Sequence, residues 1–487
     1  MKSDTSLTHV TCHMLNTGLP YTMHIDLNSC FAIIEQQANR LLRGRPVGVA
    51  AYDTPRGFVL AASYEAKAKG VKLGVNVEQS RTLAPDIVIL TPDPAKYREA
   101  HRRFKELLLE YTPDVVPKSI DEFVLDMSKS PVLTTKIQEL HTLRTSSQLS
   151  NINYQTSEAN RLLHNEAMEM IGLEMKKRIA ESLGEWVTVN VGIGTNRFLA
   201  KYAAGFNKPD GMTLIDYANL HAHYEHMKLV DLPGINTRYR TRLWTAGIFT
   251  PLDFLNADLS LLRKQVFKSI VGYYWYLRLR GHEIDNVEFS RKSIGHQYAL
   301  SDKTTDMEKL ERLLIKLCEK TGRRLRRNNL YAGGIHLYIG FASDYPMWDG
   351  PSSFENMHNI RSWHHGEKVH YRLYSTPDIY DAAKRLLHQA EIPAKVKIMS
   401  VHVFDLHDWE PEQLSIFDIK QNEISNKKQG IKTVATDIRS VGSRKRVSDA
   451  VDAINNRYGE FVVTPASMMD MSGEILDRIA FGQVRDF

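Results

Sequence analysis

The sequence contains few cysteines and no long apolar run. Cys12, Cys30 and Cys318 are the only cysteines among 487 residues, and no two of them form a C-x-x-C pair. This pattern excludes a disulfide framework and a cysteine-based metal site. No uninterrupted apolar segment is long enough to cross a bilayer, and the N-terminal stretch lacks the apolar region of a signal peptide. We therefore expect a cytoplasmic protein without a membrane partner.

A strong excess of one charge is also missing. The chain has 63 Lys and Arg against 57 Asp and Glu, a net charge of +6, which mildly favours a polyanionic partner such as nucleic acid. With 43% hydrophobic and 25% charged residues, the composition is that of a globular protein. At about 150 residues per domain, the length predicts about three or four domains.

The first two hundred residues mix strands and helices without regular alternation. In "YTMHIDLNSCF", Met23, Ile25 and Leu27 alternate with polar residues, so Asp26 lies on the polar face near the end of a strand. A helix-like pattern follows from Cys30, and residues 129–158 form a polar stretch that we expect to be an exposed insertion. This mixture predicts an α+β fold.

The rest of the chain changes character twice. Residues 214–281 are rich in helical patterns, and a charged linker follows at 285–293. A helix over about 305–327, two alternating strands and a long irregular segment at about 342–382 predict a separate α/β unit. The tail is polar from residue 411 onwards.

Two adjacent carboxylates, Asp121 and Glu122 in "SIDEFVLDM", lie between two strand-like runs. Neighbouring carboxylates raise each other's pKa unless a cation lies beside them, so the pair fits a divalent-ion site, with Asp26 as a third carboxylate. Without a histidine or cysteine nearby, such oxygen ligands favour Mg²⁺ or Mn²⁺ over zinc. The alternative from these residues alone is a solvated turn.

Five motifs occur in an order and spacing that resemble the Y-family DNA polymerases, the translesion enzymes that include bacterial polymerases IV and V. These motifs are "HIDLNSCFAIIE", "ASYEAKAKGV", "SIDEFVLDMS", "VTVNVGIGTNRFLAKYAAGFNKPDG" and "LPGI". The likeness implies a right-hand polymerase with palm, fingers, a helical thumb and an α/β little finger. The irregular segment and long tail favour the polymerase V branch.

The resemblance implies a division of the chain into named parts. An N-terminal tail (1–21) precedes the palm (22–32 and 79–213, with the insertion 129–158) and the fingers (33–78), and then come the thumb (214–284), the linker (285–293), the little finger (294–410) and a C-terminal tail (411–487).

The resemblance also assigns roles in the palm and fingers. Asp26, Asp121 and Glu122 match the catalytic, metal-binding carboxylates, with the Leu27 carbonyl completing one coordination shell of two Mg²⁺ or Mn²⁺ ions. Phe31 matches the aromatic gate that excludes a ribose 2′-hydroxyl, although the residues alone favour an ordinary core phenylalanine on an amphipathic helix. Tyr64, Lys67 and Lys208 match the contacts to the triphosphate, and the family often has Arg where Lys67 stands.

Contacts with DNA and with other proteins are expected in the later domains. Gly234 and Ile235, in "LPGI", resemble a helix-hairpin-helix turn that holds a DNA phosphate, although Asn236 replaces its usual second Gly. A basic cluster in "TGRRLRRNNL" fits the template backbone and comprises Arg323, Arg324, Arg326 and Arg327. "QLSIF" resembles the bacterial sliding-clamp peptide, with Gln413, Leu414, Ile416 and Phe417 as its anchors.

The sequence thus predicts an error-prone DNA-directed DNA polymerase of damage repair and the SOS response. Its expected partners are primed template DNA, dNTPs, the sliding clamp and accessory subunits, and its expected place is the cytoplasm at the nucleoid. Two alternatives remain. One is an inactive DNA- and clamp-bound scaffold, whose sign would be loss of the acidic residues; the other is a different two-metal nucleotidyl transferase such as a cyclase.

Overall fold

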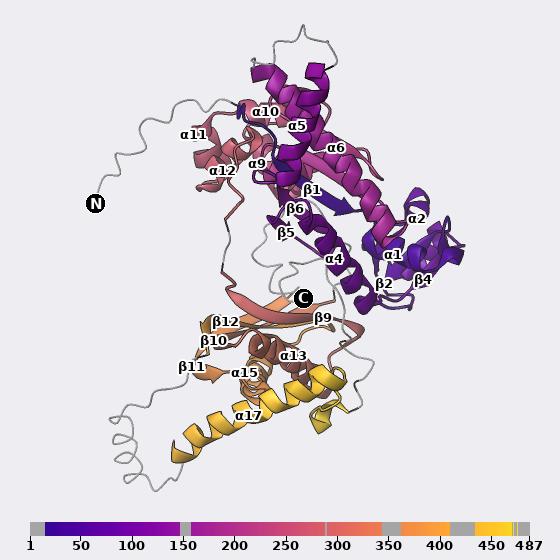
Figure 1. Cartoon of the computed structure of the whole chain (residues 1–487). Coiled ribbons are helices and arrows are strands. Elements are labelled where there is room, and N and C mark those ends of the chain that lie inside the picture. The colour runs from indigo at the N-terminus through magenta and orange to yellow at the C-terminus, as the bar shows by residue number, and fades with distance from the viewer. Residues whose placement is uncertain are drawn as a thin grey trace, which may run out of the picture. The chain divides into compact units, whose positions relative to one another are not determined.

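The computed structural model describes residues 15–146, 157–287, 290–342, 362–409, 434–469, 471 and 475 (Figure 1). The chain forms two compact units, which follow one another in sequence at residues 288 and 289. This boundary falls within the linker expected at 285–293. Among the described residues, no helix combines the length and the apolar composition that a membrane span requires.

A five-stranded sheet lies at the centre of the first unit, in the order β5-β6-β1-β7-β8. Its strands are β1 (Thr22–Leu27), β5 (Val115–Pro117), β6 (Glu122–Asp126), β7 (Val189–Gly194) and β8 (Met212–Ile215). The central strand β1 runs antiparallel to both β6 and β7. As a result, Asp26 lies directly opposite Glu122 on one side and Asn190 on the other.

Helices pack on this sheet because its strands alternate in polarity. Met23, Ile25 and Leu27 belong to the main core together with residues of α1 (Cys30–Ala38), α4 (Pro94–Leu109) and α6 (Ser157–Leu183). The polar side chains between them, His24 and Asp26, therefore belong to the other face. The short helix α7 (Arg197–Ala203) packs on β1 and β7. It approaches so closely that a Cβ on Gly192 would lie 2.0 Å from the Ala200 carbonyl oxygen, so this position requires glycine.

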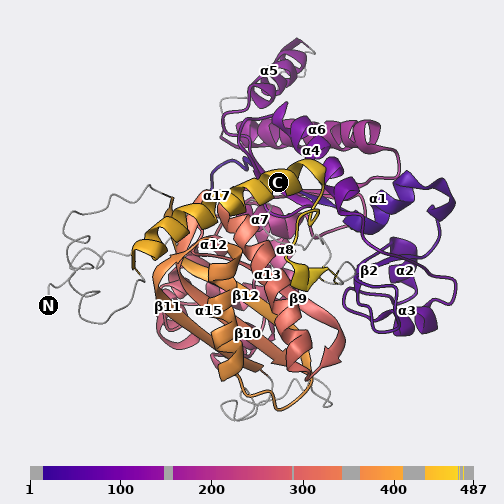
Figure 2. The same ribbon diagram turned by 90° about the horizontal axis from the view of Figure 1, so that it is seen from below.

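The expected polar insertion is largely helical in its described part. Helix α5 (Pro131–Ser146) fills most of it, and α6 already begins at Ser157. Figure 2 shows α5 projecting from the unit, beside α6. The apolar periodicity of such a polar helix is weak, so the sequence pattern did not predict the helix.

A smaller three-stranded sheet, β3-β2-β4, occupies the expected fingers. It contains β2 (Val47–Ala50), β3 (Val59–Ala62) and β4 (Val88–Leu90), with η2 (Arg40–Leu42), α2 (Tyr64–Ala68) and α3 (Val77–Leu83) around it. Because β4 pairs with β2, this part extends beyond the boundary expected at residue 78. The other boundary, between residues 32 and 33, falls inside α1.

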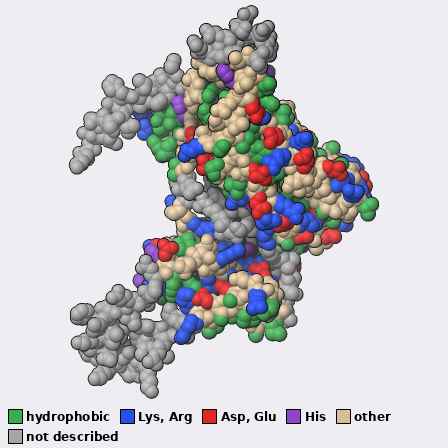
Figure 3. All heavy atoms as spheres, viewed as in Figure 1, with side chains coloured by type: hydrophobic (Ala, Val, Ile, Leu, Met, Phe, Trp, Pro, Cys, Tyr) green, Lys and Arg blue, Asp and Glu red, His purple; other side chains and the backbone are tan. Residues whose placement is uncertain are grey.

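Short helices with their own apolar core make up the rest of the first unit, in agreement with the helix-rich pattern of 214–281. They are α8 (Leu220–Glu225), η3 (Leu229–Asp231), α9 (Thr237–Thr245), α10 (Pro251–Asn256), α11 (Leu259–Leu261), η4 (Leu262–Val266) and α12 (Val271–Leu279). On the face drawn in Figure 3, acidic and basic side chains are interspersed over this unit.

The second unit contains an antiparallel sheet in the order β11-β10-β12-β9. Its elements are β9 (Ser293–Thr304), α13 (Met307–Arg327), β10 (Leu330–Phe341), β11 (Ser362–Leu373), α15 (Thr376–Gln389), β12 (Val396–Asp408), α17 (Val434–Tyr458) and η5 (Ala466–Met468). The segment expected to be irregular at 342–382 therefore contains a strand and the start of a helix. The α+β class predicted from the sequence is confirmed.

Candidate metal centre

Three carboxylates from two distant parts of the sequence meet at one end of the central sheet. Asp26 is near the end of β1, and Glu122, the first residue of β6, is its direct partner across the sheet. Asp121 precedes β6, and its carbonyl oxygen accepts a hydrogen bond from the Leu27 N–H at 2.9 Å. The structure thus brings together Asp26, Leu27, Asp121 and Glu122, the residues that the sequence assigned to metal binding.

Two lysines pair with two of these carboxylates. Lys208 Nζ donates to Asp26 Oδ2 at 2.7 Å, and Lys201 Nζ donates to the two carboxylate oxygens of Glu122 at 2.7 and 3.0 Å. Lys201, on α7, was not among the predicted site residues, although it stands seven positions before Lys208 in the same motif. Hard oxygen donors that already attract two ammonium groups fit a divalent cation.

The carboxylates differ in their electrostatic surroundings. Burial raises the pKa of Asp121 to about 6, against a lowering by the Ser119 hydroxyl, which donates to Asp121 Oδ1 at 2.5 Å. Burial also raises the pKa of Asp26, although Lys208 opposes this. Burial acts in the same direction on Glu122, but the hydrogen bonds and the charge of Lys201 oppose it, and the pKa of Glu122 is lowered. The site therefore holds one carboxylate that ionises readily, Glu122, and two whose ionised form burial disfavours, Asp26 and Asp121.

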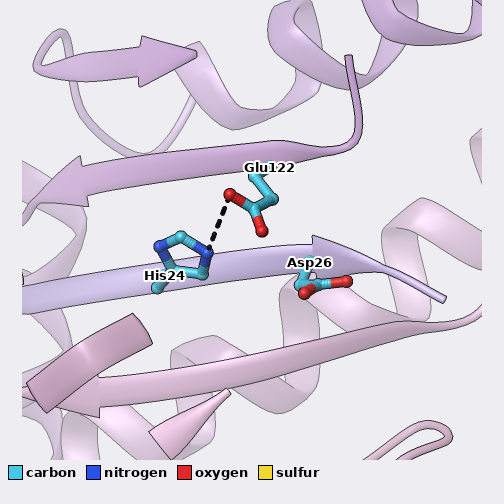
Figure 4. Close-up of side chains that lie close together, drawn as sticks. All are labelled: His24, Asp26 and Glu122. Carbon is cyan, nitrogen blue, oxygen red and sulfur yellow. Dashed lines mark ion pairs between the residues drawn. The ribbon is translucent and has the colours of Figure 1, made fainter. Parts of the chain in front are cut away.

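A histidine lies beside the carboxylates, which corrects the expectation that none is near (Figure 4). His24 Nε2 is 3.8 Å from Glu122 Oε2, and the His24 side chain is only 1% exposed. Burial lowers the pKa of His24 to about 3, so its ring is neutral. Ligand atoms of His24, Asp26 and Glu122 all lie within 4.8 Å of one another. The position of His24 could have been predicted from the sequence, because the alternation of β1 places His24 and Asp26 on the same face.

The expected triphosphate contacts lie next to the carboxylates. Lys67 Nζ donates to Ser29 Oγ at 2.7 Å and lies 4.6 Å from the centre of the Tyr64 ring. Burial raises the pKa of Tyr64 and lowers that of Lys67, and the charge of Asp26 acts on both groups. Tyr64 and Lys67 lie on α2, and Lys208 lies in the loop before β8. All three predicted triphosphate contacts are therefore close to Asp26, which Lys208 contacts directly.

Phe31 is a core residue in this structure. It is fully buried and stacks on Tyr97 with ring centroids 4.4 Å apart and planes 12° apart. The Tyr97 hydroxyl donates to Glu35 Oε1 at 2.9 Å, which fixes the ring beneath Phe31. Cys30 is also buried, against a cavity of about 290 Å³ that Tyr97 lines as well. This packing agrees with the interpretation of Phe31 as a core residue, and its role as a steric gate stays a prediction.

The "LPGI" turn has an unexpected cap. Gly234 adopts φ +94°, which requires glycine, and Ile235 is buried. The Asn236 side chain accepts hydrogen bonds from the N–H groups of Arg238 and Tyr239 at 3.1 and 3.2 Å. In a helix-hairpin-helix, such free N–H groups would face a phosphate. Asn236 therefore occupies part of the predicted phosphate site.

The predicted basic cluster is mostly engaged within the second unit. Arg326 is buried and forms a two-pronged ion pair with Asp452 of α17, at 2.6 and 3.0 Å. Arg323 pairs with Glu460 at 3.1 Å, and Arg324 donates to the Gly295 carbonyl oxygen at 2.8 Å. For Arg326, the expectation of a template contact is therefore wrong in this arrangement, because its guanidinium is covered. Arg327 is exposed.

The clamp-like peptide, Gln413 to Phe417, lies outside the described residues. It stays a prediction from the sequence.

Comparisons with known proteins agree with this geometry. The model of the impB/mucB/samB family matches residues 25–205, and the model of that family's C-terminal domain matches residues 291–416. DNA polymerase IV of Moorella thermoacetica is 30% identical over 460 residues, which cover 92% of this chain and 96% of that protein. DNA polymerase IV of Pelotomaculum thermopropionicum is 29% identical over 459 residues, with 93% and 96% covered. Among solved structures, a Y-family DNA polymerase chimera, Dbh-Dpo4(243-245)-Dbh, shares the fold with a TM-score of 0.62 and 23% identity, over 80% of this chain and 99% of that one.

Proposed function

This chain belongs to the impB/mucB/samB family, and we propose that it is a DNA-directed DNA polymerase of the Y family that copies primed templates past damaged bases. The relatives that match it over nearly their whole length are named DNA polymerase IV. The observation that carries the proposal is the meeting of Asp26, Asp121 and Glu122 at the end of the sheet, where Lys208 pairs with Asp26 and Lys201 with Glu122.

The carboxylates would hold two Mg²⁺ ions, or Mn²⁺ in their place, with the Leu27 carbonyl as a further oxygen donor. When bound, such a pair of ions activates the primer 3′-oxygen and neutralises the leaving pyrophosphate. Asp26 and Glu122 approach from neighbouring strands, so the backbone register itself sets their separation. Asp121 adds a buried carboxylate from the adjoining turn.

The lysines and Tyr64 would bind the triphosphate of the incoming dNTP. Lys208 and Lys67 both lie beside Asp26 and carry positive charge on flexible stems, which suits phosphate oxygens. The Tyr64 hydroxyl can donate a hydrogen bond to the same group. Phe31, at the start of α1, would limit the space beneath the sugar and so select deoxynucleotides.

The remaining roles follow from the proposed reaction. Gly234 and Ile235, with the exposed Arg327, would contact the DNA backbone without reading its sequence. Residues 413–417 would bind the sliding clamp, and accessory subunits would join during the SOS response. Because the template is the bacterial chromosome, the protein would work in the cytoplasm at the nucleoid. No observation favours an inactive scaffold, since all three carboxylates are present.

Primer extension with and without single carboxylates tests this function. We expect Asp26→Asn and Glu122→Gln each to slow Mg²⁺-dependent extension at least about 100-fold, the usual scale for loss of one charge-stabilising group, while DNA binding persists. Asp126→Asn is the matched control, because Asp126 lies on β6 like Glu122 but at the opposite end of the strand, where it pairs with Thr22. Extension at the wild-type rate by both site variants would refute the assignment.

A further inference from the structure

A cavity of about 290 Å³ lies between α1 and α4 of the first unit. Leu27 lines it and follows Asp26 on β1, and successive residues of a strand point to opposite faces of the sheet. The cavity is therefore separate from the carboxylate site. Its floor is buried, because five of its side chains are each at most 7% exposed. These are Leu27, Cys30, Ile34, Tyr97 and Phe104.

Polar side chains that line the cavity already have partners elsewhere. His101 Nδ1 contacts a backbone carbonyl oxygen at 2.9 Å, and the Tyr97 hydroxyl donates to Glu35. Gln37 Oε1 accepts a hydrogen bond from the Trp186 N–H at 2.9 Å. A buried water needs about two to four polar partners, whereas an apolar cavity stays dry and takes apolar guests. The cavity therefore suits an apolar guest better than water.

The charged groups at the mouth of the cavity are paired with carboxylates or with each other. Arg103 Nε donates to Glu99 Oε1 at 2.7 Å. Lys96 Nζ donates to Glu35 Oε2, also at 2.7 Å. A charged ligand would have to compete with these pairs and would also lose its hydration on the apolar floor. The lining therefore favours a neutral ligand.

We propose that this cavity binds a small neutral aromatic molecule, and that the occupant restrains Phe31 through Tyr97. The rings of Tyr97 and Phe104 both line the cavity, and aromatic rings pack favourably against a further ring. The volume is close to the lower end of ligand pockets, about 300 Å³, so the occupant has one or two fused rings. Indole has this size and this chemistry.

Tyr97 connects the cavity with Phe31. Its ring lines the cavity and also stacks on Phe31, with ring centroids 4.4 Å apart. The cavity gives the Tyr97 ring room to move away from Phe31, and an occupant would remove this room, because close-packed groups transmit such a restraint. Under the proposed function, Phe31 limits the space beneath the sugar, so occupancy should lower ribonucleotide use. Only this consequence rests on the proposed function.

Titration calorimetry of the full chain with indole tests the site. We expect one saturable site with a Kd of about 1 mM or tighter. Ala38→Trp, at the exposed mouth, and Cys30→Leu, on the floor, should each weaken binding at least about tenfold by taking up the space. Ala453→Trp, at an exposed position of α17, is the matched control. Absence of saturable binding, or wild-type affinity in both cavity variants, would overturn the proposal.

A charged analogue tests the class of ligand. Indole-3-carboxylate adds one negative charge to the same rings and should bind at least about tenfold more weakly than indole. Equal or tighter binding of the carboxylate would overturn the assignment to neutral ligands.

Single-nucleotide incorporation measures the restraint on Phe31. We expect saturating indole to lower the ratio of ribonucleotide to deoxynucleotide use about tenfold in the wild-type protein and to leave it unchanged in Ala38→Trp. An unchanged ratio in wild-type protein that binds indole would overturn the restraint. Indole binding in a protein that never extends a primer would refute the proposed function and leave the ligand site. Extension by a protein that does not bind indole would leave the polymerase and overturn the site.

Discussion

Removing the carboxylate of Asp452 should loosen the C-terminal helix α17 from the second unit. Asp452 is the partner of Arg326, and the side chains of the two residues are 14% and 3% exposed. Arg326 Nε and Nη2 each donate to one carboxylate oxygen, at 2.6 and 3.0 Å. In Asp452→Ala, the guanidinium would stay buried without its main counter-charge.

The size of the effect follows from what remains around Arg326. Breaking a buried ion pair from one side costs about 3–5 kcal/mol. Arg326 Nη1 would keep the Tyr374 carbonyl oxygen at 3.2 Å, and Glu319 Oε1 would stay 3.8 Å from Nη2. These partners favour the lower end, about 3 kcal/mol. At 1.36 kcal/mol per factor of ten, this is about a 150-fold rise in the opening equilibrium of α17.

Hydrogen exchange of the α17 amides measures this opening. We expect Asp452→Ala to speed exchange over residues 445–458 about 150-fold, while α12 in the first unit is unaffected. Arg327→Ala is the control, because Arg327 is exposed on the same helix as Arg326. Exchange in Asp452→Ala within about threefold of wild type would refute the reasoning, and so would an equal change in Arg327→Ala.

Two further predictions concern the nucleotide pocket and the tail. Phe31→Leu should raise ribonucleotide use relative to deoxynucleotides about 10–200-fold, the range for small changes in pocket shape, as measured by single-nucleotide incorporation. Phe104→Leu, in an equally buried phenylalanine of the same core, is the control, and an unchanged ratio in Phe31→Leu would leave Phe31 as a core residue only. Replacing Gln413, Leu414, Ile416 and Phe417 by Ala should abolish stimulation by a sliding clamp and spare basal extension, and retained stimulation would exclude the peptide.

The sequence predicted well what depends on local periodicity. The alternation of residues 22–27 placed Asp26 on the polar face near a strand end, and β1 has that form. Periodicity could not show that Glu122 is the partner of Asp26, because the pairing of strands so far apart in sequence has no local signal. Only the family resemblance assigned the two residues to one site. His24 was within reach of the pattern, since it shares the face of Asp26.

The burial of Arg326 has a different reason. A run of basic residues at a helix end is typical of a solvated or nucleic-acid-binding face. Whether another element covers that face depends on tertiary packing, and here α17, more than one hundred residues further along, supplies Asp452. The apolar periodicity of α13 predicts which side of the helix packs on the sheet. The contact with α17 is made by charged side chains, so it leaves no apolar periodicity in the sequence from which it could be predicted.

The two adjacent carboxylates finally show why neighbours in sequence need not be a pair in space. Glu122 begins β6 and shares the face of Asp26 and His24, whereas Asp121 lies in the turn before the strand and accepts its hydrogen bond from Ser119. Glu122 has Lys201, and Asp26 has Lys208, but no lysine or arginine contacts Asp121 within the described residues. Burial therefore raises the pKa of Asp121 to about 6, while that of Glu122 is lowered. Within the described residues, Asp121 is thus the carboxylate that lacks a lysine partner and whose ionised form burial disfavours, although it lies next to Glu122 in the sequence.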